Sequence, residues 1–469
     1  MSTDPAAPGP SFPRYATHAR VREVVLVRPG PLPPAPYAGV ETDLVRGRGH
    51  AALHLGDWSL SARTGRGGVV LQASHAGRRL DVPAGPRTRW RRWRTRTRTA
   101  EVLALTLTGP CAVAWTRDAD GWTARARLDL AGAPGTPVHP TGPGGVHDPA
   151  VLATLRAEGD RHGAFGGLGL RDPRLVTHAD GTPWREGDDV LVTATSAGPG
   201  GFRTGHTSVW AFHTGTGALT HRGDLFARRG GAVVGDHAVH LVREDDGWLL
   251  ATSTWGDFDL GDRPRVGVGL ARTRADVTRG THVLDTEPLP LPTGPHRSVG
   301  VWDPHLRRDA DGVWHVAFVS ATRFFDFHPV LARGTELSGT GLTWVAAASD
   351  RHACEGVTWA RDTTGRWWLL ASEGGDGDPE HRLRYPVFDA GLRAVATLGA
   401  DFPGNIPWPT LLPGLPGSPG NQAPWMMGFD GVSAGGPVLP YGTHGALVLQ
   451  RPVGGGDHPG TPGDHPSCH

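Results

Sequence analysis

The sequence contains no lysine, since all 47 of its basic residues are arginine. That absence excludes a lysine Schiff base, a pyridoxal-phosphate site and a Walker-type phosphate loop, each of which depends on a lysine. Cysteine is scarce as well. The three residues Cys111, Cys354 and Cys468 form no CxxC pair, which argues against a disulfide framework and against a zinc site.

Long hydrophobic runs are also lacking. The first twenty residues contain no apolar core of the kind found in a secretory signal, and no segment reaches membrane-spanning length. The formal net charge is only +1, so no bulk electrostatic field would attract nucleic acid or a membrane surface. We therefore expect a soluble, cytoplasmic protein with neither nucleic acid nor membrane as a partner.

Glycine (69 residues), proline (42) and tryptophan (17) are abundant, and the apolar stretches are short and separated by Gly or Asp turns. This pattern predicts an all-β protein. We expect a Pro-rich arm over residues 1–45, a β-rich, sandwich-like accessory domain over 46–135, a larger β domain over 141–451 and a disordered tail over 452–469. Gly and Pro residues between 131 and 145 indicate the linker.

Arg87–Ala100, "RTRWRRWRTRTRTA", is the strongest run of charge in the chain. The alternation of Arg with Thr and Trp predicts an edge strand with a solvated arginine face. A site for an acidic glycan or for nucleic acid is the alternative interpretation, and salt-dependent binding would separate the two.

A motif repeats along the larger domain. An acid is followed by a short apolar strand, a Gly turn and a second apolar strand that ends at Ser or Thr. The acid and the final Ser are 17 residues apart in three of the four copies, from 236 to 253, 303 to 320 and 355 to 372. The four acids, which we take to occupy equivalent positions, are Asp172, Asp236, Asp303 and Glu355.

The four acids are 64, 67 and 52 residues apart. A repeating unit of roughly 50 to 65 residues that holds about four strands is typical of a propeller blade. Residues 405–431, with a closing strand at 443–451, supply a fifth unit. The fold class predicted is therefore a five-bladed β-propeller with an N-terminal β-sandwich-like domain. Because the innermost strands of all blades run along one axis, the four acids should converge in one funnel, where neighbouring carboxylates raise one another's pKa values.

The motifs "LRDPRLV", "VWDPHL" and "CEGVTW", in this order and at this spacing, resemble the five-bladed furanosidase clan. That clan comprises the arabinanases, xylosidases and arabinofuranosidases of glycoside hydrolase family 43 and the related invertases and levansucrases. The resemblance covers residues 141–451. It implies a glycoside hydrolase acting on furanosides or related pentose and fructose glycosides, with an oligosaccharide or small glycoside as its partner.

Carried onto this sequence, the resemblance makes Asp172 the base and Glu355 the general acid. Asp303 becomes a charged neighbour that raises the pKa of Glu355 and binds sugar hydroxyls. Asp236 lies in a blade where the family has no catalytic residue, and either contacts substrate or caps a turn. A water-activating base implies inversion of the anomeric centre.

Two features depart from the family. Its added domain more often follows the propeller, and its "RDP" signature belongs to the middle Asp of the invertases, so the stereochemical course stays open. Asp148, in "HDP", is a rival first acid. We favour Asp172 because strand, turn and strand follow it, whereas the segment after Asp148 has a helical pattern.

The remaining candidates concern binding. Arg171 and His305 are expected to contact the substrate, and four tryptophans are candidates for stacking on sugar faces: Trp302, Trp359, Trp408 and Trp425. Their structural alternative is packing between blades. No cofactor and no catalytic metal are expected, although His206 and His444 could approach an axis that holds an ion such as calcium. A non-catalytic carbohydrate-binding propeller is the alternative function, because it would keep the aromatic residues without needing a spaced acid pair.

Overall fold

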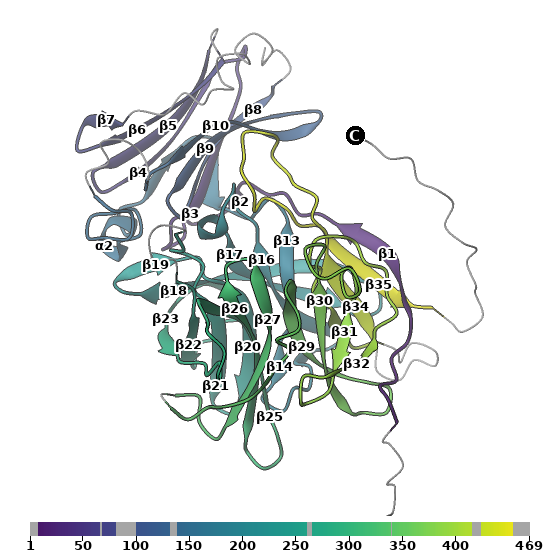
Figure 1. The fold of residues 1–469 in the computed structure, drawn as a ribbon. Helices are drawn as coiled ribbons and strands as arrows, with labels where there is room; N and C mark the ends of the chain where they lie inside the picture. Colours follow the sequence, from purple (N-terminus) through teal and green to yellow (C-terminus); the bar gives the residue numbers. More distant parts are fainter. Residues whose placement is uncertain are drawn as a thin grey trace, which may run out of the picture.

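The structure is a computed structural model that describes residues 8–65, 68–80, 100–131, 138–259, 265–338, 340–414 and 424–453. It is built almost entirely from antiparallel β-sheets (Figure 1). Most of the arginine-rich run, from 87 to 99, lies outside the described residues, as does the tail from 454 with Cys468. Within the described ranges no helix is long and apolar enough to cross a membrane.

The N-terminal part of the chain forms two sheets that share one hydrophobic core. The strands of the six-stranded sheet are, in spatial order, β10 (Gly121–Asp129), β9 (Cys111–Asp118), β8 (Val102–Thr108), β3 (Tyr37–Asp43), β12 (Arg161–Ala164) and β2 (Arg28–Pro29). Those of the five-stranded sheet are β11 (Arg156–Glu158), β4 (Gly49–Leu55), β5 (Trp58–Gly65), β6 (Gly68–His75) and β7 (Arg78–Leu80). We call these two sheets the N-terminal unit.

Five further sheets follow. The first contains β13 (Leu170–Leu175), β16 (Asp189–Ser196), β17 (His206–His213), β18 (Leu219–Arg229) and β19 (Ala232–Val234), with β15 (Arg185–Glu186) and β23 (Gly280–Asp285) at its edges. The second contains β14 (Thr177–His178), β20 (His237–Glu244), β21 (Gly247–Ser253), β22 (Val268–Thr273) and β24 (Glu287–Leu289). The third contains β25 (Gly300–Arg308), β26 (Trp314–Arg323), β27 (Asp326–Gly334) and β28 (Thr343–Ala347).

The fourth sheet contains β29 (Cys354–Arg361), β30 (Trp367–Glu373), β31 (Pro386–Phe388) and β32 (Ala394–Thr397). The fifth contains β33 (Thr410–Leu412), β34 (Trp425–Phe429), β35 (Leu447–Pro452) and β1 (Tyr15–Val21). The predicted strand-turn-strand units correspond to β20–β21, β25–β26 and β29–β30, and the insertion in the first unit holds β14 and β15.

The five sheets follow one another in a ring. The strands β13, β20, β25, β29 and β33 contact their neighbours in that order, and β33 contacts β13 again. Separate hydrophobic clusters fill the spaces between adjacent sheets, including the space between the fifth sheet and the first. Because both faces of each sheet are covered, the central strands are buried along most of their length rather than alternately.

The N-terminal segment differs from the expected Pro-rich arm. Residues 15–21 form β1, which pairs with β35 and completes the fifth sheet, and residues 37–43 form β3 within the N-terminal unit. The proline content of the segment concealed these strands, because β1 lies between Pro13 and Pro29 and β3 begins directly after Pro36. The N-terminal unit also extends beyond residue 135, since β11 and β12 return to pair with β4 and β3. The unit is therefore inserted between β1 of the fifth sheet and β13 of the first.

Candidate active site

The same backbone irregularity interrupts the inner strand of four sheets. The pairs concerned are β13–β16, β20–β21, β25–β26 and β29–β30. In each pair the inner strand has two residues that are left out of the pairing, and these directly follow Arg171, His237, Trp302 and Glu355. The next residue has a left-handed backbone in every case: φ is 52° at Asp172, 58° at Ala238, 57° at Asp303 and 69° at Gly356. Asp adopts this conformation more readily than most residues, and a β-bulge re-aims the side chains beside it.

This bulge corrects the predicted equivalence of the four acids. Glu355 precedes the left-handed residue by one position, and Asp236 precedes Ala238 by two. The Asp236 carboxylate therefore lies outside the pocket that holds the other acids. It accepts hydrogen bonds of 2.8 and 2.9 Å from Arg229 and one of 2.9 Å from the Gly256 amide. Its substrate-binding role is not supported, and it has the structural role that was the alternative.

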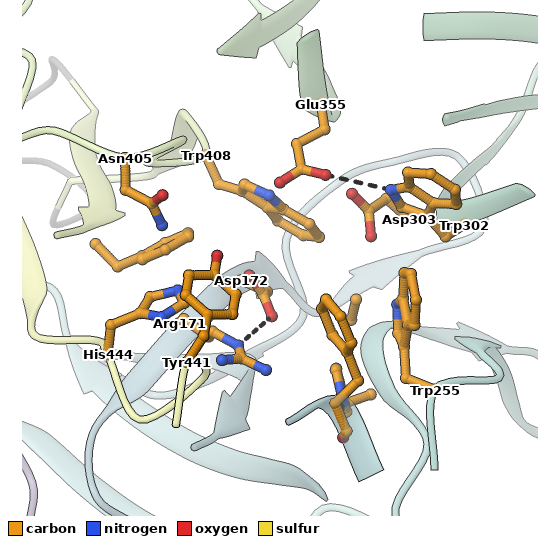
Figure 2. Close-up of a pocket in the computed structure, with 14 residues that line it drawn as sticks. Arg171, Asp172, Trp255, Trp302, Asp303, Glu355, Asn405, Trp408, Tyr441 and His444 are labelled. Atoms are coloured by element: carbon orange, nitrogen blue, oxygen red, sulfur yellow. Dashed lines mark hydrogen bonds and ion pairs between the residues drawn. The ribbon is translucent and has the colours of Figure 1, made fainter. Parts of the chain in front are cut away.

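Asp172, Asp303 and Glu355 line one open cavity at the end of the ring (Figure 2). They come from β13, β25 and β29, three different sheets, as the repeat predicted. The cavity lining is Arg171, Asp172, Phe202, His237, Ala238, Trp255, Trp302, Asp303, Glu355, Asn405, Trp408, Phe429, Tyr441 and His444. Asp148 is elsewhere, because its carboxylate caps the short helix α2 (Pro149–Leu152) through the Ala150 amide.

Each carboxyl group has a different set of neighbours. Arg171 Nε lies 3.3 Å from Asp172 Oδ2, and the Trp302 indole N–H donates to Glu355 Oε2 at 3.2 Å (Figure 2). Asp303 is almost fully buried, and its Oδ2 has no hydrogen-bond partner among the described residues. The site thus contains a paired carboxylate, an indole-bound carboxyl group and a buried carboxyl group with one oxygen that lacks a hydrogen-bond partner among the described residues.

The structure explains why a glycine follows Glu355 in the motif "CEGVTW". A β-carbon at this position would lie 2.4 Å from Cδ1 of Trp408, and the positive φ would strain any other residue. Trp408 itself has a φ of 51°, two residues before β33 begins at Thr410. Its ring reaches the cavity because the glycine lets it approach the backbone of β29.

Arg174 lies deeper in the ring and is fully buried. Its Nη1 is 2.7 Å from His305 Nδ1 on β25 and 3.0 Å from the Val357 carbonyl on β29. Its guanidinium carbon lies 4.7 Å from the centre of the Trp408 ring, while the His305 ring contacts His240 on β20. The guanidinium group of Arg174 therefore contacts β25 and β29 directly and lies over the Trp408 ring, near the axis of the ring of sheets.

Charge balance constrains the protonation of the site. Burial raises the pKa of Asp172, which Arg171 partly offsets, and burial with the charges of Glu355 and Asp172 raises the pKa of Asp303 well above its usual range. Burial and the charge of Asp172 raise the pKa of Glu355 to about 7, against the opposing hydrogen bond from Trp302.

The two arginines provide two fixed positive charges for three carboxyl groups. Two ionised carboxylates and one proton give a neutral site, and the raised pKa values of Asp303 and Glu355 favour one of these two groups as the holder of the proton. The charge that raises the pKa of Glu355 comes mainly from Asp172 rather than from Asp303, which had been expected to supply it.

Several other candidates lie outside the cavity. Trp359 packs in the core between the third and fourth sheets beside Arg307, and Trp425 lies under Arg451 with its indole N–H on the Thr214 carbonyl. Both have the packing role that was the alternative to sugar stacking. His305 is buried and accepts hydrogen bonds from Arg174 and the Trp359 amide. It therefore holds Arg174 and β29 in place below the cavity rather than contacting a ligand.

Of the two histidines proposed near the axis, His444 lines the cavity, whereas His206 is buried beside Asp224 and Tyr37. Among the described residues no group of three or more His, Cys, Asp or Glu is gathered as for a metal ion.

The sequence did not predict Phe202, Trp255 and Tyr441, three aromatic residues of the cavity lining that we call the aromatic wall. Phe202 stacks on Trp255 at 4.5 Å, and Tyr441 lies 6.5 Å from Phe202. These residues come from loops outside the repeated motif, so no spacing marked them. His237 and Ala238 lie at the bulge of the second sheet, one and two residues after the acid that the repeat had aligned.

The molecule is thus a nearly all-β protein with a ring of sheets around a cavity that contains three carboxyl groups and aromatic side chains. No protein-family model and no curated protein sequence matches the chain. Similar solved structures are glycoside hydrolases, and the family 43 enzyme and the β-fructofuranosidase among them belong to groups that the sequence motifs resemble.

Three of these can be described. A family 117 glycoside hydrolase from Zobellia galactanivorans is 11% identical, with a TM-score of 0.42, over 60% of this chain and 84% of that one. A family 43 enzyme from Xanthomonas citri is 15% identical, with a TM-score of 0.40, over 62% and 88%. A family 32 β-fructofuranosidase from Bombyx mori is 12% identical, with a TM-score of 0.39, over 61% and 63%. At these values the function proposed below has to rest on the cavity itself.

Proposed function

We propose that the chain is a glycoside hydrolase and that its ring of five sheets is a five-bladed β-propeller with an N-terminal sandwich-like domain. One observation carries the proposal. Three carboxyl groups from three sheets converge in one cavity, and among the described residues Arg171 and Arg174 provide the positive charge beside them. Glycoside hydrolysis needs a proton donor and a second carboxylate at one bond, and this arrangement supplies both.

Glu355 is the general acid. Its proton passes to the glycosidic oxygen as the bond between that oxygen and the anomeric carbon breaks. Asp172 accepts a proton from a water molecule, whose oxygen forms the new bond to the anomeric carbon. Asp303, which lines the cavity, accepts hydrogen bonds from sugar hydroxyls.

The substrate class proposed is a furanoside or a related pentose or fructose glycoside, presented as an oligosaccharide or a small glycoside. The faces of Trp302 and Trp408 suit the C–H faces of a sugar ring, and Arg171 can donate to its hydroxyls. No cofactor enters this reaction. An axial cation such as calcium would have to lie beside the buried guanidinium of Arg174, which would repel it.

We expect a bell-shaped dependence of kcat/KM on pH. The alkaline limb falls near pH 7, because the acid must be protonated and burial with Asp172 raises the pKa of Glu355 to about 7. The acidic limb falls as Asp172 gains a proton, at a pH above the ordinary range of an Asp because its pKa is raised. Initial rates in constant-ionic-strength buffers measure both limbs. A rate that stays flat from pH 5 to 9 would contradict the assignment.

The function itself is tested by turnover of 4-nitrophenyl α-L-arabinofuranoside, 4-nitrophenyl β-D-xyloside and sucrose. We expect hydrolysis of at least one, with inversion, so that proton NMR detects first the anomer opposite to that of the substrate. Inversion requires the carboxyl groups of Asp172 and Glu355 to leave room for a water molecule, about 6.5 to 9.5 Å apart. Sugar binding without turnover across a wider panel would instead favour a carbohydrate-binding protein.

A further inference from the structure

The N-terminal unit contacts two loops that form part of the cavity wall. The loop 197–205 joins β16 to β17 and carries Phe202, and the loop 430–446 joins β34 to β35 and carries Tyr441 and His444. The second of these loops extends from the fifth sheet up to the strands of the N-terminal unit (Figure 1). Their anchoring therefore decides how this side of the cavity is built.

Tyr37, on β3, holds the first loop. It is fully buried, and its hydroxyl group lies 3.0 Å from both the Arg203 and the Gly205 carbonyl oxygens. Asp129, at the end of β10, accepts a hydrogen bond of 3.0 Å from the Arg203 side chain. The turn between β8 and β9 also abuts this loop, since a β-carbon on Gly109 would lie 2.3 Å from the Arg203 carbonyl oxygen.

The second loop is held by backbone and apolar contacts. The Ala124 amide of β10 donates to the Gly435 carbonyl at 3.0 Å, and Ala434, Val438 and Leu439 pack against the core of the N-terminal unit. The two loops are joined to each other by a hydrogen bond of 2.7 Å from the Gly201 amide to the Tyr441 carbonyl.

The contacts continue into the catalytic group. Arg171 Nη1 donates to the Gly442 carbonyl of the second loop at 2.8 Å, while its Nε lies 3.3 Å from Asp172. From the first loop, the Phe202 carbonyl lies 3.1 Å from His237 Nε2, on the cavity wall. Hydrogen bonds, together with the backbone of the two loops between them, therefore link β10 and β3 of the N-terminal unit to the side chains around Asp172.

We propose that the N-terminal unit is an integral part of the active site, in which Tyr37 and Asp129 act as positioning residues. They fix the wall formed by Phe202 and Tyr441 and thereby set the affinity of the site for its sugar. The affinity part of this proposal rests on the proposed function, whereas the positioning part does not. Tyr37 touches no cavity atom, so its effect must pass through the two loops.

The test uses the full chain with Tyr37→Phe and Asp129→Asn. Tyr37→Phe removes only the hydroxyl group and keeps the ring contacts with His206 and Phe226. Tyr385→Phe is the matched control, because Tyr385 is equally buried and its hydroxyl bonds the Asp401 carbonyl in a part of the ring away from the cavity. Asp43→Asn breaks an ion pair with Arg161 that stays within the N-terminal unit.

Hydrogen exchange read by mass spectrometry gives the first measurement. We expect exchange in both loops to rise about 10-fold in Tyr37→Phe and in Asp129→Asn, and to stay at the wild-type rate in both controls. Unchanged exchange in both loops overturns the proposal whether or not the protein turns over any glycoside.

Sugar affinity gives the second measurement, by titrating L-arabinose, D-xylose and D-fructose against tryptophan fluorescence. For whichever sugar binds, we expect Kd to rise about 10-fold in Tyr37→Phe. On a substrate that is turned over, KM should rise by a similar factor with kcat within about twofold. Loosened loops with unchanged Kd and KM would overturn the affinity part. A wild-type protein without turnover would remove the proposed function and leave the exchange result standing.

Discussion

Replacing Glu355 with Gln is expected to lower hydrolysis of glycosides with sugar leaving groups by about 10²- to 10⁴-fold, the usual contribution of a general acid. Gln has the same shape and can still meet the Trp302 indole, but it has no proton to transfer. The loss should be smaller for 4-nitrophenyl glycosides, because nitrophenolate departs without protonation. The alkaline limb of the pH profile should vanish as well, since the group that titrates near pH 7 is gone.

Glu373→Gln provides the matched control for this experiment. Glu373 is a buried glutamate of the same sheet, at the end of β30, whose Oε1 accepts a hydrogen bond from the Ala353 amide. It does not line the cavity. We expect the control to keep the wild-type pH profile and the same dependence on the leaving group. An equal loss on sugar and nitrophenyl leaving groups in Glu355→Gln would remove the acid role from Glu355.

The Glu355→Gln substitution should also stabilise the folded protein at alkaline pH. The folded-state pKa of about 7 exceeds the ordinary glutamate value of 4.5, so the wild-type protein loses stability as the pH rises through this interval. The difference corresponds to at most about 3 kcal/mol. Denaturant unfolding at pH 8 should therefore show Glu355→Gln as the more stable protein, with the gap closing near pH 4.

Arg174→Met is expected to have the second large effect, on both stability and titration. Methionine fills similar volume but removes a buried charge that acts on Asp303 and Asp172, and breaking such a buried set costs about 3 to 5 kcal/mol. Without this cation, the carboxyl groups must bind a further proton to restore neutrality. The pKa values of Asp303 and Asp172 rise, and the acidic limb of the kcat/KM profile, which Asp172 sets, moves up by about one pH unit or more.

The sign of the stability loss follows from the same argument. Carboxyl groups with raised folded-state pKa values stabilise the folded protein below their unfolded values and destabilise it as the pH rises. Arg174→Met should therefore lose more stability at pH 8 than at pH 5, which urea unfolding at both values would measure. Arg307→Met is the control, because Arg307 stacks on Trp359 and Trp367 at 5.0 Å and contacts no carboxyl group of the cavity.

If Arg174→Met does not fold at pH 8, Arg174→Lys answers the same question. Lysine keeps the charge and loses the planar fork that reaches His305 and the Val357 carbonyl. We expect the pH profile to be largely restored, with lower stability. A folded Arg174→Met whose pH profile overlays that of the wild type would show that the axial charge does not govern the carboxyl groups.

The repeat made the strand pairs and the meeting of Asp172, Asp303 and Glu355 predictable, because residues at one end of the inner strands of a ring must converge. It misplaced Asp236, because matching acids to serines ignored the two-residue bulge that sets which side chain turns into the cavity. A sequence records such a bulge only through residues that tolerate a positive φ, and Ala238 gives no such signal.

The aromatic wall could not be predicted for a different reason. Phe202 and Tyr441 lie on loops whose conformation depends on contacts with the N-terminal unit, and no local pattern encodes those contacts. Proline content was also misleading near the N-terminus. The strand β1 alternates weakly in burial and takes its partner from the other end of the chain, so no neighbouring segment marks it as part of a sheet.

The pairing of β1 with β35 has a consequence for how the protein is made. The strand β1 is synthesised long before its partner, because Tyr15 pairs with Pro452, which is 437 residues later in the sequence (452 − 15). The N-terminal unit can fold while synthesis continues, but the ring stays open and β1 keeps an unpaired edge until β35 has been synthesised. Ring closure is then a late, long-range event of the kind that folds slowly, and the fifth sheet is the seam where the ring is completed last.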